Sequence, residues 1–287
     1  MFSMIIPVYN EESSIGDVLN EAMNALKDIK HEIIVVDDGS IDKTAEIARA
    51  KGVKVISHPE NAGYGTSIKT GIKASKYDYI GIVDGDGSYP VKDFPGMVEF
   101  MKDYDMVVGA RRGKYYWGSI IHHPSRLFFL WWVRYVTGTS IPDANSGMRI
   151  FKRDTVLSFM DPLSKGFSFT TSLTLVMTLR GKFVKYVPID YYKRKGKSKV
   201  KWYKYPLRSF QILLETVIYY NPIKLIIPIC LFTGLASIIL WVCYFIFWGP
   251  LLAWLASLTG FLTVEGFLIG LIVIQNSMRY RTQGESK

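Results

Sequence analysis

The carboxyl-terminal part of the chain is almost free of charge, and this limits what the chain can fold into. Between Leu225 and Met278 the only acidic or basic side chain is Glu265, whereas charged residues occur throughout the first 210 positions. Two apolar stretches in this tail, Ile223 to Phe247 and Leu251 to Ile274, each exceed the ~20 residues that a helix needs to cross about 30 Å of hydrocarbon. The sequence therefore predicts a globular part followed by a membrane-inserted tail.

The two apolar stretches are expected to form a hairpin. Trp248, Gly249 and Pro250 between them combine an interfacial aromatic side chain with two residues that break helices. Basic residues flank the pair on both outer ends, and the turn has none, so the positive-inside rule predicts a globular part and both chain ends in the cytosol. These residues are Lys193, Arg194, Lys195, Lys197, Lys199, Lys201, Lys204 and Arg208 before the hairpin, and Arg279, Arg281 and Lys287 after it.

The net charge of +10 does not indicate nucleic acid as a partner, because the basic residues concentrate beside the membrane segment. Anionic headgroups attract each such residue by about 1 kcal/mol near the surface. Cys230 and Cys243 both fall in the first apolar stretch and match no metal or disulfide pattern, so they are interpreted as apolar filler. No basic region or cleavage site precedes the first apolar strand, and no signal peptide is expected.

Short apolar runs alternate with amphipathic segments through the first hundred residues. The expected strands are Met4 to Val8, Glu32 to Asp37, Val53 to Ser57, Tyr79 to Asp84 and Met106 to Val108. The expected helices are Ser14 to Leu26, Thr44 to Lys51, Gly65 to Ala74 and Val91 to Met101. This order is typical of an α/β fold with a mostly parallel sheet flanked by helices.

Three parts follow from these patterns. We expect a cytosolic globular domain over residues 1–200, a juxtamembrane amphipathic segment over 201–222, and a transmembrane hairpin with a short cytosolic tail over 223–287. The aromatic segment Leu127 to Val136 is too short to span a membrane and is interpreted, with Tyr203 to Tyr220, as interfacial helix, although a core helix remains an alternative for the former. Glu265 is expected to be protonated, paired or turned toward protein, and we favour a contact in a homo-oligomer.

Acidic residues follow two of the predicted strands. Asp84 and Asp86 lie two positions apart at the end of one strand, so both carboxylates can face one side and share a divalent cation, Mg²⁺ or Mn²⁺. An isolated pair of this kind usually only solvates a turn. Here Asp37 and Asp38 end an earlier strand of the same sheet and are expected at the same edge, where ligands bind in such folds. The second pair favours the metal site.

The motifs around these acids resemble those of a known family. Ile-Pro-Val-Tyr-Asn-Glu at 6–11, Val-Val-Asp-Asp-Gly-Ser at 35–40, Asn-Ala-Gly-Tyr-Gly at 61–65 and Asp-Gly-Asp-Gly at 84–87 resemble the successive motifs of glycosyltransferase family 2, whose members have the Rossmann-like GT-A fold. Asp-Ala-Asn-Ser-Gly-Met-Arg at 143–149 and Arg-Lys-Gly-Lys-Ser-Lys at 194–199 are similar to motifs of dolichyl-phosphate mannose and polyprenyl-phosphate glucose synthases. The latter subgroup often ends in two membrane helices.

The resemblance implies a nucleotide site and a metal site. Asp86 would be the principal metal ligand beside Asp84, and Ser88 stands where many relatives have Gln. The nucleotide contacts would come from Pro7, Tyr9, Glu11, Asp37, Asp38 and Gly63. From the residues alone, other interpretations stay open: Tyr9 could be packing, Glu11 a charge that complements a helix amino terminus, and Gly63 with Gly65 a turn.

An anionic lipid acceptor would require cations near the membrane. The resemblance implies Arg126, Ser146, Arg149, Arg194, Ser198 and Lys199 as contacts of the acceptor or the diphosphate, and Asp86, Arg111 and Arg126 as catalytic residues. Guanidinium groups can contact phosphate through two nitrogens at once. Each cation could instead be a solvated surface charge, and this interpretation is preferred for Lys195, Lys197 and Lys201.

The predicted reaction is transfer of a hexose from a nucleotide-sugar, UDP-glucose or GDP-mannose, to a polyprenyl or dolichyl phosphate. The acceptor phosphate is ionised at neutral pH and can attack the anomeric carbon without a strong general base. By resemblance this single displacement inverts the anomeric configuration. The alternatives are a processive polysaccharide synthase, which normally carries a Gln-x-x-Arg-Trp motif and more membrane helices than this chain, and a non-catalytic nucleotide-binding membrane scaffold.

Overall fold

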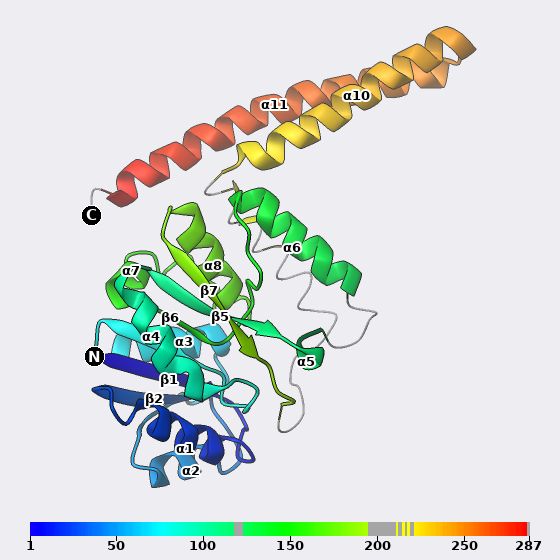
Figure 1. The fold of residues 1–287 in the computed structure, drawn as a ribbon. Coiled ribbons are helices and arrows are strands. Elements are labelled where there is room, and N and C mark those ends of the chain that lie inside the picture. Colours follow the sequence, from blue (N-terminus) through cyan, green and yellow to red (C-terminus); the bar gives the residue numbers. More distant parts are fainter. Residues whose placement is uncertain (118–122, 195–210, 212–213, 216, 219–220, 286–287) are drawn as a thin grey trace. The chain divides into compact units, whose positions relative to one another are not determined.

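The computed structural model describes residues 1–117, 123–194, 211, 214–215, 217–218 and 221–285, with the backbone alone at 114, 117, 123–126 and 277–285 (Figure 1). The chain divides into two compact units, Met1–Ile212 and Leu213–Lys287. We describe each unit by itself. The three-part division at residues 200 and 222 stays a prediction.

The described residues of the first unit contain a seven-stranded sheet in the order β3-β2-β1-β4-β6-β5-β7. The strands are β1 (Phe2–Val8), β2 (His31–Asp37), β3 (Lys54–Ser57), β4 (Tyr79–Ile82), β5 (Met106–Arg112), β6 (Arg149–Lys152) and β7 (Val184–Asp190). Neighbouring strands are parallel, except that β6 is antiparallel to both β4 and β5. The mostly parallel sheet expected from the sequence is confirmed.

Helices lie on both faces of this sheet (Figure 1). The described helices of this unit are α1 (Ile15–Leu26), α2 (Thr44–Ala50), α3 (Tyr64–Ala74), α4 (Phe94–Glu99), α5 (Lys114–Trp117), α6 (His123–Thr137), α7 (Arg153–Leu157) and α8 (Phe169–Leu179). The even-numbered β1 residues, such as Met4 and Ile6, share a core cluster with Leu19 of α1. Ile5 faces the other way and lies against Gly71 of α3. Burial on both faces explains why Met4 to Val8 of β1 form a continuous apolar run without alternation.

Several boundaries differ from the sequence-based expectation. The strand expected to reach Asp84 ends at Ile82, and β5 extends to Arg112. The helix expected over Val91 to Met101 is divided into a 3₁₀ turn (η1, Val91–Asp93), α4, and a second 3₁₀ turn (η2, Phe100–Lys102). A proline in the first turn of α4 supports this division, because proline cannot donate the backbone hydrogen bond of a continuing helix.

The aromatic segment is helical and has two different faces. In α6, Val133 and Val136 are buried, whereas the side chains of Leu127, Phe128 and Trp131 are more than half exposed. The rings of Phe128 and Trp131 lie 5.9 Å apart between centroids. The helix therefore contributes to the core on one side and carries an aromatic surface on the other, and its interfacial position stays a prediction.

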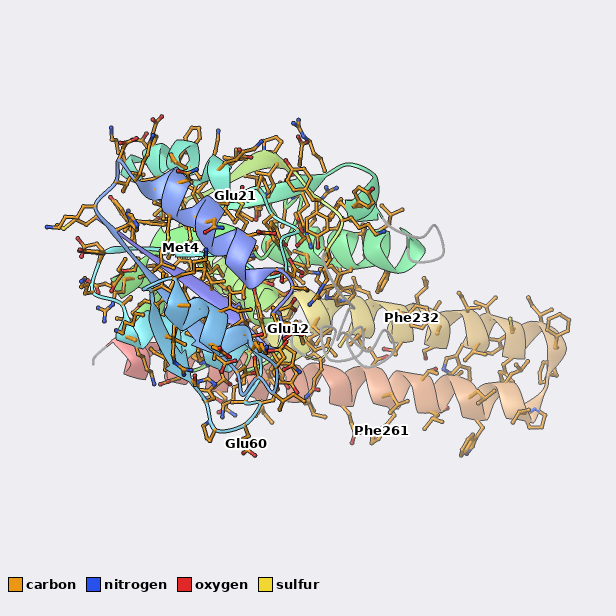
Figure 2. The ribbon with its side chains drawn as sticks, turned by 90° about the horizontal axis from the view of Figure 1, so that it is seen from below. Met4, Glu12, Glu21, Glu60, Phe232 and Phe261 are labelled. Carbon is orange, nitrogen blue, oxygen red and sulfur yellow. The ribbon has the colours of Figure 1, made fainter. Side chains whose placement is uncertain are left out.

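The second unit contains a helical hairpin of α10 (Ile223–Phe247) and α11 (Pro250–Glu285). In the described part of the chain, Ile223–Phe247 and Pro250–Asn276 are the two helical segments long and apolar enough to cross a membrane. Phe232 and Phe261 point outward from the hairpin (Figure 2) and are 75% and 59% exposed. An apolar outer surface of this kind suits a lipid environment.

Small and hydroxyl-bearing side chains line the contact between α10 and α11. Ser237 Oγ donates to the Ala256 carbonyl at 2.8 Å, and Thr263 Oγ1 donates to Thr233 Oγ1 at 2.8 Å. Small residues allow close approach of two helices, and hydroxyls add interhelical hydrogen bonds where water is absent.

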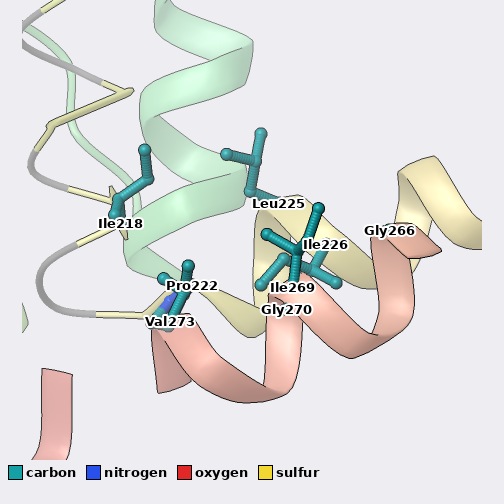
Figure 3. Close-up of a pocket in the computed structure, with 8 residues that line it drawn as sticks. All are labelled: Ile218, Pro222, Leu225, Ile226, Gly266, Ile269, Gly270 and Val273. Carbon is teal, nitrogen blue, oxygen red and sulfur yellow. The ribbon is translucent and has the colours of Figure 1, made fainter. Parts of the chain in front are cut away.

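Near one end of the hairpin, α10 and α11 border an apolar pocket of about 140 Å³ that is lined by residues such as Leu225 and Ile269 (Figure 3).

The close packing of α3 on β1 leads to a prediction about stability. A methyl group on Gly71 would lie 2.4 Å from Ile5 Cγ2, so Gly71→Ala should destabilise the folded state by about 1–3 kcal/mol through overpacking. Thermal unfolding of the purified protein measures this as a lower midpoint. Gly96→Ala in α4 is the matched control, because no atom lies within 4 Å of that methyl position. Equal midpoints for the two variants would contradict the packing.

Candidate active site

The loops that follow β1, β2 and β4 meet at one edge of the sheet. β1 lies between β2 and β4, so the chain's path reverses direction across the sheet at β1. Asp38 N donates to the Val8 carbonyl at 2.9 Å, and Ser14 Oγ donates to the Gly85 carbonyl at 2.8 Å. These bonds connect the three loops. A reversal point at the carboxyl ends of parallel strands is where open α/β sheets bind ligands.

The loop after β1 has a strained backbone that its neighbours hold in place. Asn10 adopts a left-handed conformation with φ of 52°. Its Oδ1 accepts from Ile41 N at 2.8 Å, and its N–H donates to Ser40 Oγ at 2.9 Å. Glu11 N donates to Thr44 Oγ1 at 2.7 Å. Non-glycine residues in this conformation persist where surrounding structure over-determines them, as it often does at functional sites.

The predicted nucleotide residues Pro7, Tyr9 and Glu11 come together at this point. Pro7 lies in β1 opposite Val36, one residue before the strand ends. Tyr9 is partly exposed, and Glu11 is 7% exposed. The Glu11 side chain accepts from Ser14 Oγ at 3.3 Å and from Arg194. Glu11 is therefore more than a charge at the amino terminus of α1, because its carboxylate binds a cation from a distant part of the chain.

Asp37 and Asp38 organise the two neighbouring loops. Asp37 Oδ1 accepts from Ser40 N at 3.1 Å and caps the turn after β2. The Asp38 oxygens accept from Ala62 N at 3.0 Å and Gly63 N at 2.9 Å. Both residues are buried. The loop that carries Gly63 is thus positioned by Asp38, and direct nucleotide contacts of these residues stay a prediction.

Asp84 and Asp86 lie in the loop that follows β4. Asp86 is 7% exposed, and its Oδ1 accepts from Ser88 N at 3.0 Å and from the Ser88 hydroxyl. Ser88 thus holds the Asp86 carboxylate in place rather than standing apart from it. Asp84 Oδ1 accepts from the Tyr64 hydroxyl at 2.7 Å.

The charge of Asp86 affects the protonation of Asp84. Burial, followed by the negative charge of Asp86, raises the pKa of Asp84 to about 6. Burial also raises the pKa of Tyr64, so its hydroxyl keeps a proton to donate to Asp84. The described residues contain no group of three or more His, Cys, Asp or Glu arranged to hold a metal. The carboxylates of Asp84 and Asp86 nevertheless fit part of the oxygen coordination shell of a hard divalent cation, and a bound ligand would supply further oxygens.

Arg194 connects the nucleotide loop to this carboxylate pair. Its guanidinium donates to Glu11 Oε1, and its Nε lies 3.5 Å from Asp86 Oδ2. The side chain is 25% exposed. The structure therefore brings three of the predicted site residues, Glu11, Asp86 and Arg194, into one charged cluster. Ser198 and Lys199 lie outside the described residues, as does the side chain of Arg126, whose backbone belongs to α6.

Arg111 lies within β5. The strand expected from the sequence ended at Val108, which had placed Arg111 beyond it. Its Nε and Nη2 donate to the two carboxylate oxygens of Asp143 at 2.7 and 2.9 Å. Its guanidinium also lies over the rings of Tyr116 and Tyr191, at 5.0 and 5.3 Å from their centroids. Burial would raise the pKa of Asp143, but Arg111 lowers it below the usual value. Arg111 is therefore already paired, and a direct role in catalysis stays a prediction.

Arg149 and Ser146 are placed differently from our expectation that they contact the acceptor or the diphosphate. Arg149 has no exposed surface, and its Nε and Nη1 donate to the carbonyls of Ser146 and Thr170 at 3.0 and 2.9 Å. Ser146 is also fully buried and accepts from Met148 N at 3.3 Å. A buried guanidinium requires hydrogen-bond acceptors, and Arg149 finds them in both the 143–147 loop and α8. Arg149 therefore holds this loop against α8. We correct its role from ligand contact to support of the loop.

Other residues near the site did not stand out in the sequence. Gly147 lies against the Asp84 carboxylate, and its N–H donates to the Tyr89 hydroxyl at 2.7 Å. Tyr89 packs edge-on against Tyr191 at 5.2 Å. Tyr64 and Gly147 both belong to motifs that carried the family resemblance, so their position in those motifs was the available signal. Nothing in the sequence around Tyr89 or Tyr191 indicates their contacts.

The fold resembles solved glycosyltransferase structures. A glucosyl-3-phosphoglycerate synthase from Mycobacterium tuberculosis, in complex with phosphoglyceric acid, superposes with a TM-score of 0.64 at 22% identity, covering 75% of this chain and 79% of that one. A structure of that enzyme with Mn²⁺, UDP-glucose and phosphoglyceric acid gives a TM-score of 0.62 at 21% identity, with the same coverage. This likeness confirms the GT-A fold.

Curated relatives extend the comparison to sequence. A low-salt glycan biosynthesis hexosyltransferase of Haloferax volcanii is 31% identical over 206 residues, which cover 69% of this chain and 49% of the relative, so the match spans about half the length of that protein. A dolichyl-phosphate hexose transferase of the same organism is 30% identical over 203 residues, covering 69% and 86%. An undecaprenyl-phosphate mannosyltransferase of Micrococcus luteus is 28% identical over 212 residues, covering 68% and 86%.

The family model described as glycosyl transferase family 2 matches residues 3–159, which include the loops after β1, β2 and β4 and the carboxylates of Asp84 and Asp86. The residues, the fold and the relatives agree, and the chain belongs to glycosyl transferase family 2.

Proposed function

We propose that this chain transfers a hexose from a nucleotide-sugar to the phosphate of a polyprenyl or dolichyl lipid, at the cytosolic face of a membrane. The observation that carries the proposal is the charged cluster at the reversal point of the sheet, where Arg194 bridges Glu11 and Asp86. Two helical segments of membrane length in the same chain support a lipid acceptor. So do relatives named for dolichyl and undecaprenyl phosphate.

The donor nucleotide is proposed to bind over the loops that follow β1 and β2. Pro7, Tyr9 and Glu11 supply one side of this site, and Asp37, Asp38 and the loop at Gly63 supply the other. Gly63 has a φ of 101°, and a methyl group on it would lie 2.8 Å from the Lys165 carbonyl. The position therefore requires glycine whether or not a nucleotide approaches its backbone. UDP-glucose and GDP-mannose are both candidate donors.

Asp84 and Asp86 are the residues that would hold Mg²⁺ or Mn²⁺. Their hard oxygen donors and the raised pKa of Asp84, caused by burial and by Asp86, fit a divalent cation. When bound, the cation would neutralise charge on the diphosphate of the donor. Ser88 donates to Asp86 and Tyr64 donates to Asp84 through the hydrogen bonds described above.

The acceptor phosphate needs cations, and Arg194 is the described residue best placed to meet it. An acceptor phosphate oxygen forms the new bond to the anomeric carbon, while the bond from that carbon to the nucleoside diphosphate breaks, which inverts the anomeric configuration. Arg194 exchanges its carboxylate partners for phosphate oxygens, and Arg111, Arg126, Ser198 and Lys199 complete the proposed acceptor site. A phosphate oxygen is already ionised at neutral pH, so no strong general base is required.

Loss of the metal site is expected to abolish transfer. Asp86→Asn removes a charge from the proposed metal ligand and should eliminate lipid-linked sugar, as should excess chelator. Purified protein is incubated with polyprenyl phosphate, Mg²⁺ or Mn²⁺ and a panel of labelled nucleotide-sugars, followed by lipid extraction. Asp190→Asn is the matched control, because Asp190 is a 62% exposed partner of Arg112. Full transfer in excess chelator would exclude a divalent-metal mechanism.

Removal of the Arg194 guanidinium is expected to slow transfer about tenfold to hundredfold. Charge-assisted hydrogen bonds contribute roughly 1.5–3 kcal/mol, and each 1.36 kcal/mol corresponds to about a factor of ten in rate. Turnover and its dependence on polyprenyl phosphate are measured for Arg194→Gln in one membrane preparation. Arg112→Gln, which removes a 63% exposed guanidinium, should retain turnover. Unchanged kinetics in Arg194→Gln would remove this residue from the acceptor site.

The proposed orientation predicts that the hairpin turn and the globular domain face opposite compartments. After Cys230 and Cys243 are replaced by serine, single cysteines are introduced at Gly249 in the turn or at the exposed Asp28 after α1. A membrane-impermeant thiol reagent added outside intact cells should label the turn and not Asp28→Cys. Permeabilised cells provide the control for reactivity. Labelling of both positions from outside would contradict the cytosolic domain.

A further inference from the structure

The Tyr64 hydroxyl is a notable contact of the carboxylate pair because it comes from a different element. Tyr64 is the first residue of α3, whereas Asp84 follows β4. The hydroxyl donates to Asp84 Oδ1 at 2.7 Å. The described residues offer no hydrogen bond to Asp84 Oδ2, so one oxygen is held and the other is left for a ligand.

The Tyr64 ring is held by a second aromatic ring. Phe167 stacks on it with ring centroids 5.4 Å apart and an angle of 9° between the ring planes. Phe167 belongs to a loop that is tied to the start of α3. Thr66 N donates to the Lys165 carbonyl at 3.0 Å, and Lys69 Nζ donates to the Leu163 carbonyl at 2.6 Å. These hydrogen bonds hold the loop that carries Phe167 against α3. The stacked rings therefore limit where the Tyr64 hydroxyl can lie.

Gly147 borders the same carboxylate closely. A methyl group on Gly147 would lie 2.4 Å from Asp84 Oδ2 and 2.6 Å from Oδ1, closer than atoms can approach. The Gly147 N–H donates to the Tyr89 hydroxyl, which keeps this backbone in place. The Asp84 carboxylate thus accepts a hydrogen bond on one oxygen and lies against the backbone of Gly147, which has no side chain.

We propose that Tyr64 is a positioning residue, which orients the Asp84 carboxylate for a divalent cation by donating to one oxygen and leaving the other to the metal. This inference rests on the proposed function, because it assumes that Asp84 and Asp86 hold the cation. Hydrogen bonds to a ligating carboxylate typically affect metal affinity by 10- to 100-fold when removed. Packing alone would give Tyr64 a contribution to stability and none to metal affinity.

The test is direct Mn²⁺ binding to the full-length protein. Tyr64→Phe removes the hydroxyl and keeps the ring that stacks on Phe167. Free Mn²⁺ is measured by electron paramagnetic resonance as the metal is titrated alone, with UDP and with GDP, and thermal unfolding is recorded for every variant. We expect Tyr64→Phe to weaken Mn²⁺ binding about tenfold or more while the protein stays folded.

Two further variants separate the metal role from packing. Tyr186→Phe is the matched control, because its buried hydroxyl has no hydrogen-bond partner among the described residues, and it should bind Mn²⁺ as the wild type does. Phe167→Leu keeps the Tyr64 hydroxyl but removes the stack, and it should weaken binding by less than Tyr64→Phe.

The outcomes distinguish the inference from the function beneath it. Wild-type protein that binds no Mn²⁺ under any condition would overturn the proposed metal site, and the role of Tyr64 with it. If Mn²⁺ binds to Tyr64→Phe with the same affinity as to the wild-type protein, the positioning role of Tyr64 is overturned and the metal site is not. Equal weakening in Tyr64→Phe and Tyr186→Phe would assign the effect to general loss of a buried hydroxyl. If Tyr64→Phe does not fold, wild-type affinity in Phe167→Leu would overturn the supporting stack and the inference.

Discussion

Two carboxylates placed close together in a partly buried loop are the constraint on which the rest of the site depends. Water stabilises such charges poorly there, so the pKa of Asp84 rises to about 6 through burial and the charge of Asp86. The surrounding groups stabilise the negative charge of the pair: Tyr64 donates to Asp84, Ser88 donates to Asp86, and Arg194 lies beside Asp86. A divalent cation and a diphosphate would rearrange these contacts, and Arg194, which is partly exposed and belongs to a loop, is the group best able to change partners.

Two arginines support the loops of the site, the fully buried Arg149 and the partly buried Arg111. Arg149 is bonded to backbone carbonyls and the Thr174 hydroxyl, and Arg111 is paired with Asp143. Removing an acceptor from either guanidinium would leave a buried donor without a partner, which costs more than a typical surface hydrogen bond contributes. These contacts join β5, the 143–149 loop and α8, so the position of Gly147 beside Asp84 depends on a network that extends away from the site.

Features that depend on short-range patterns could be predicted from the sequence. The continuous apolar run of β1, the helix starting near Ile15 and the two membrane-length helices follow from periodicity and length, and the structure confirms them. The loops with Asp38 and Asp86 were predicted at one edge of the sheet because parallel strands place their carboxyl ends together. The break of the helix over Val91 to Met101 was missed, although its proline was visible in the sequence, because amphipathic spacing outweighed it in our interpretation.

The sequence by itself determined the fold class, the motif positions and the apolar hairpin, because each is encoded in neighbouring residues. Tertiary structure alone decided which polar atoms meet. The antiparallel β6 was not among the predicted strands, and it brings Arg149 into the interior, where this motif residue supports its own loop. Contacts such as Tyr64 with Asp84 and Arg194 with Glu11 join residues 20 and 183 positions apart. No local pattern specifies such pairs, because they form only when the packing of the whole domain brings distant segments together.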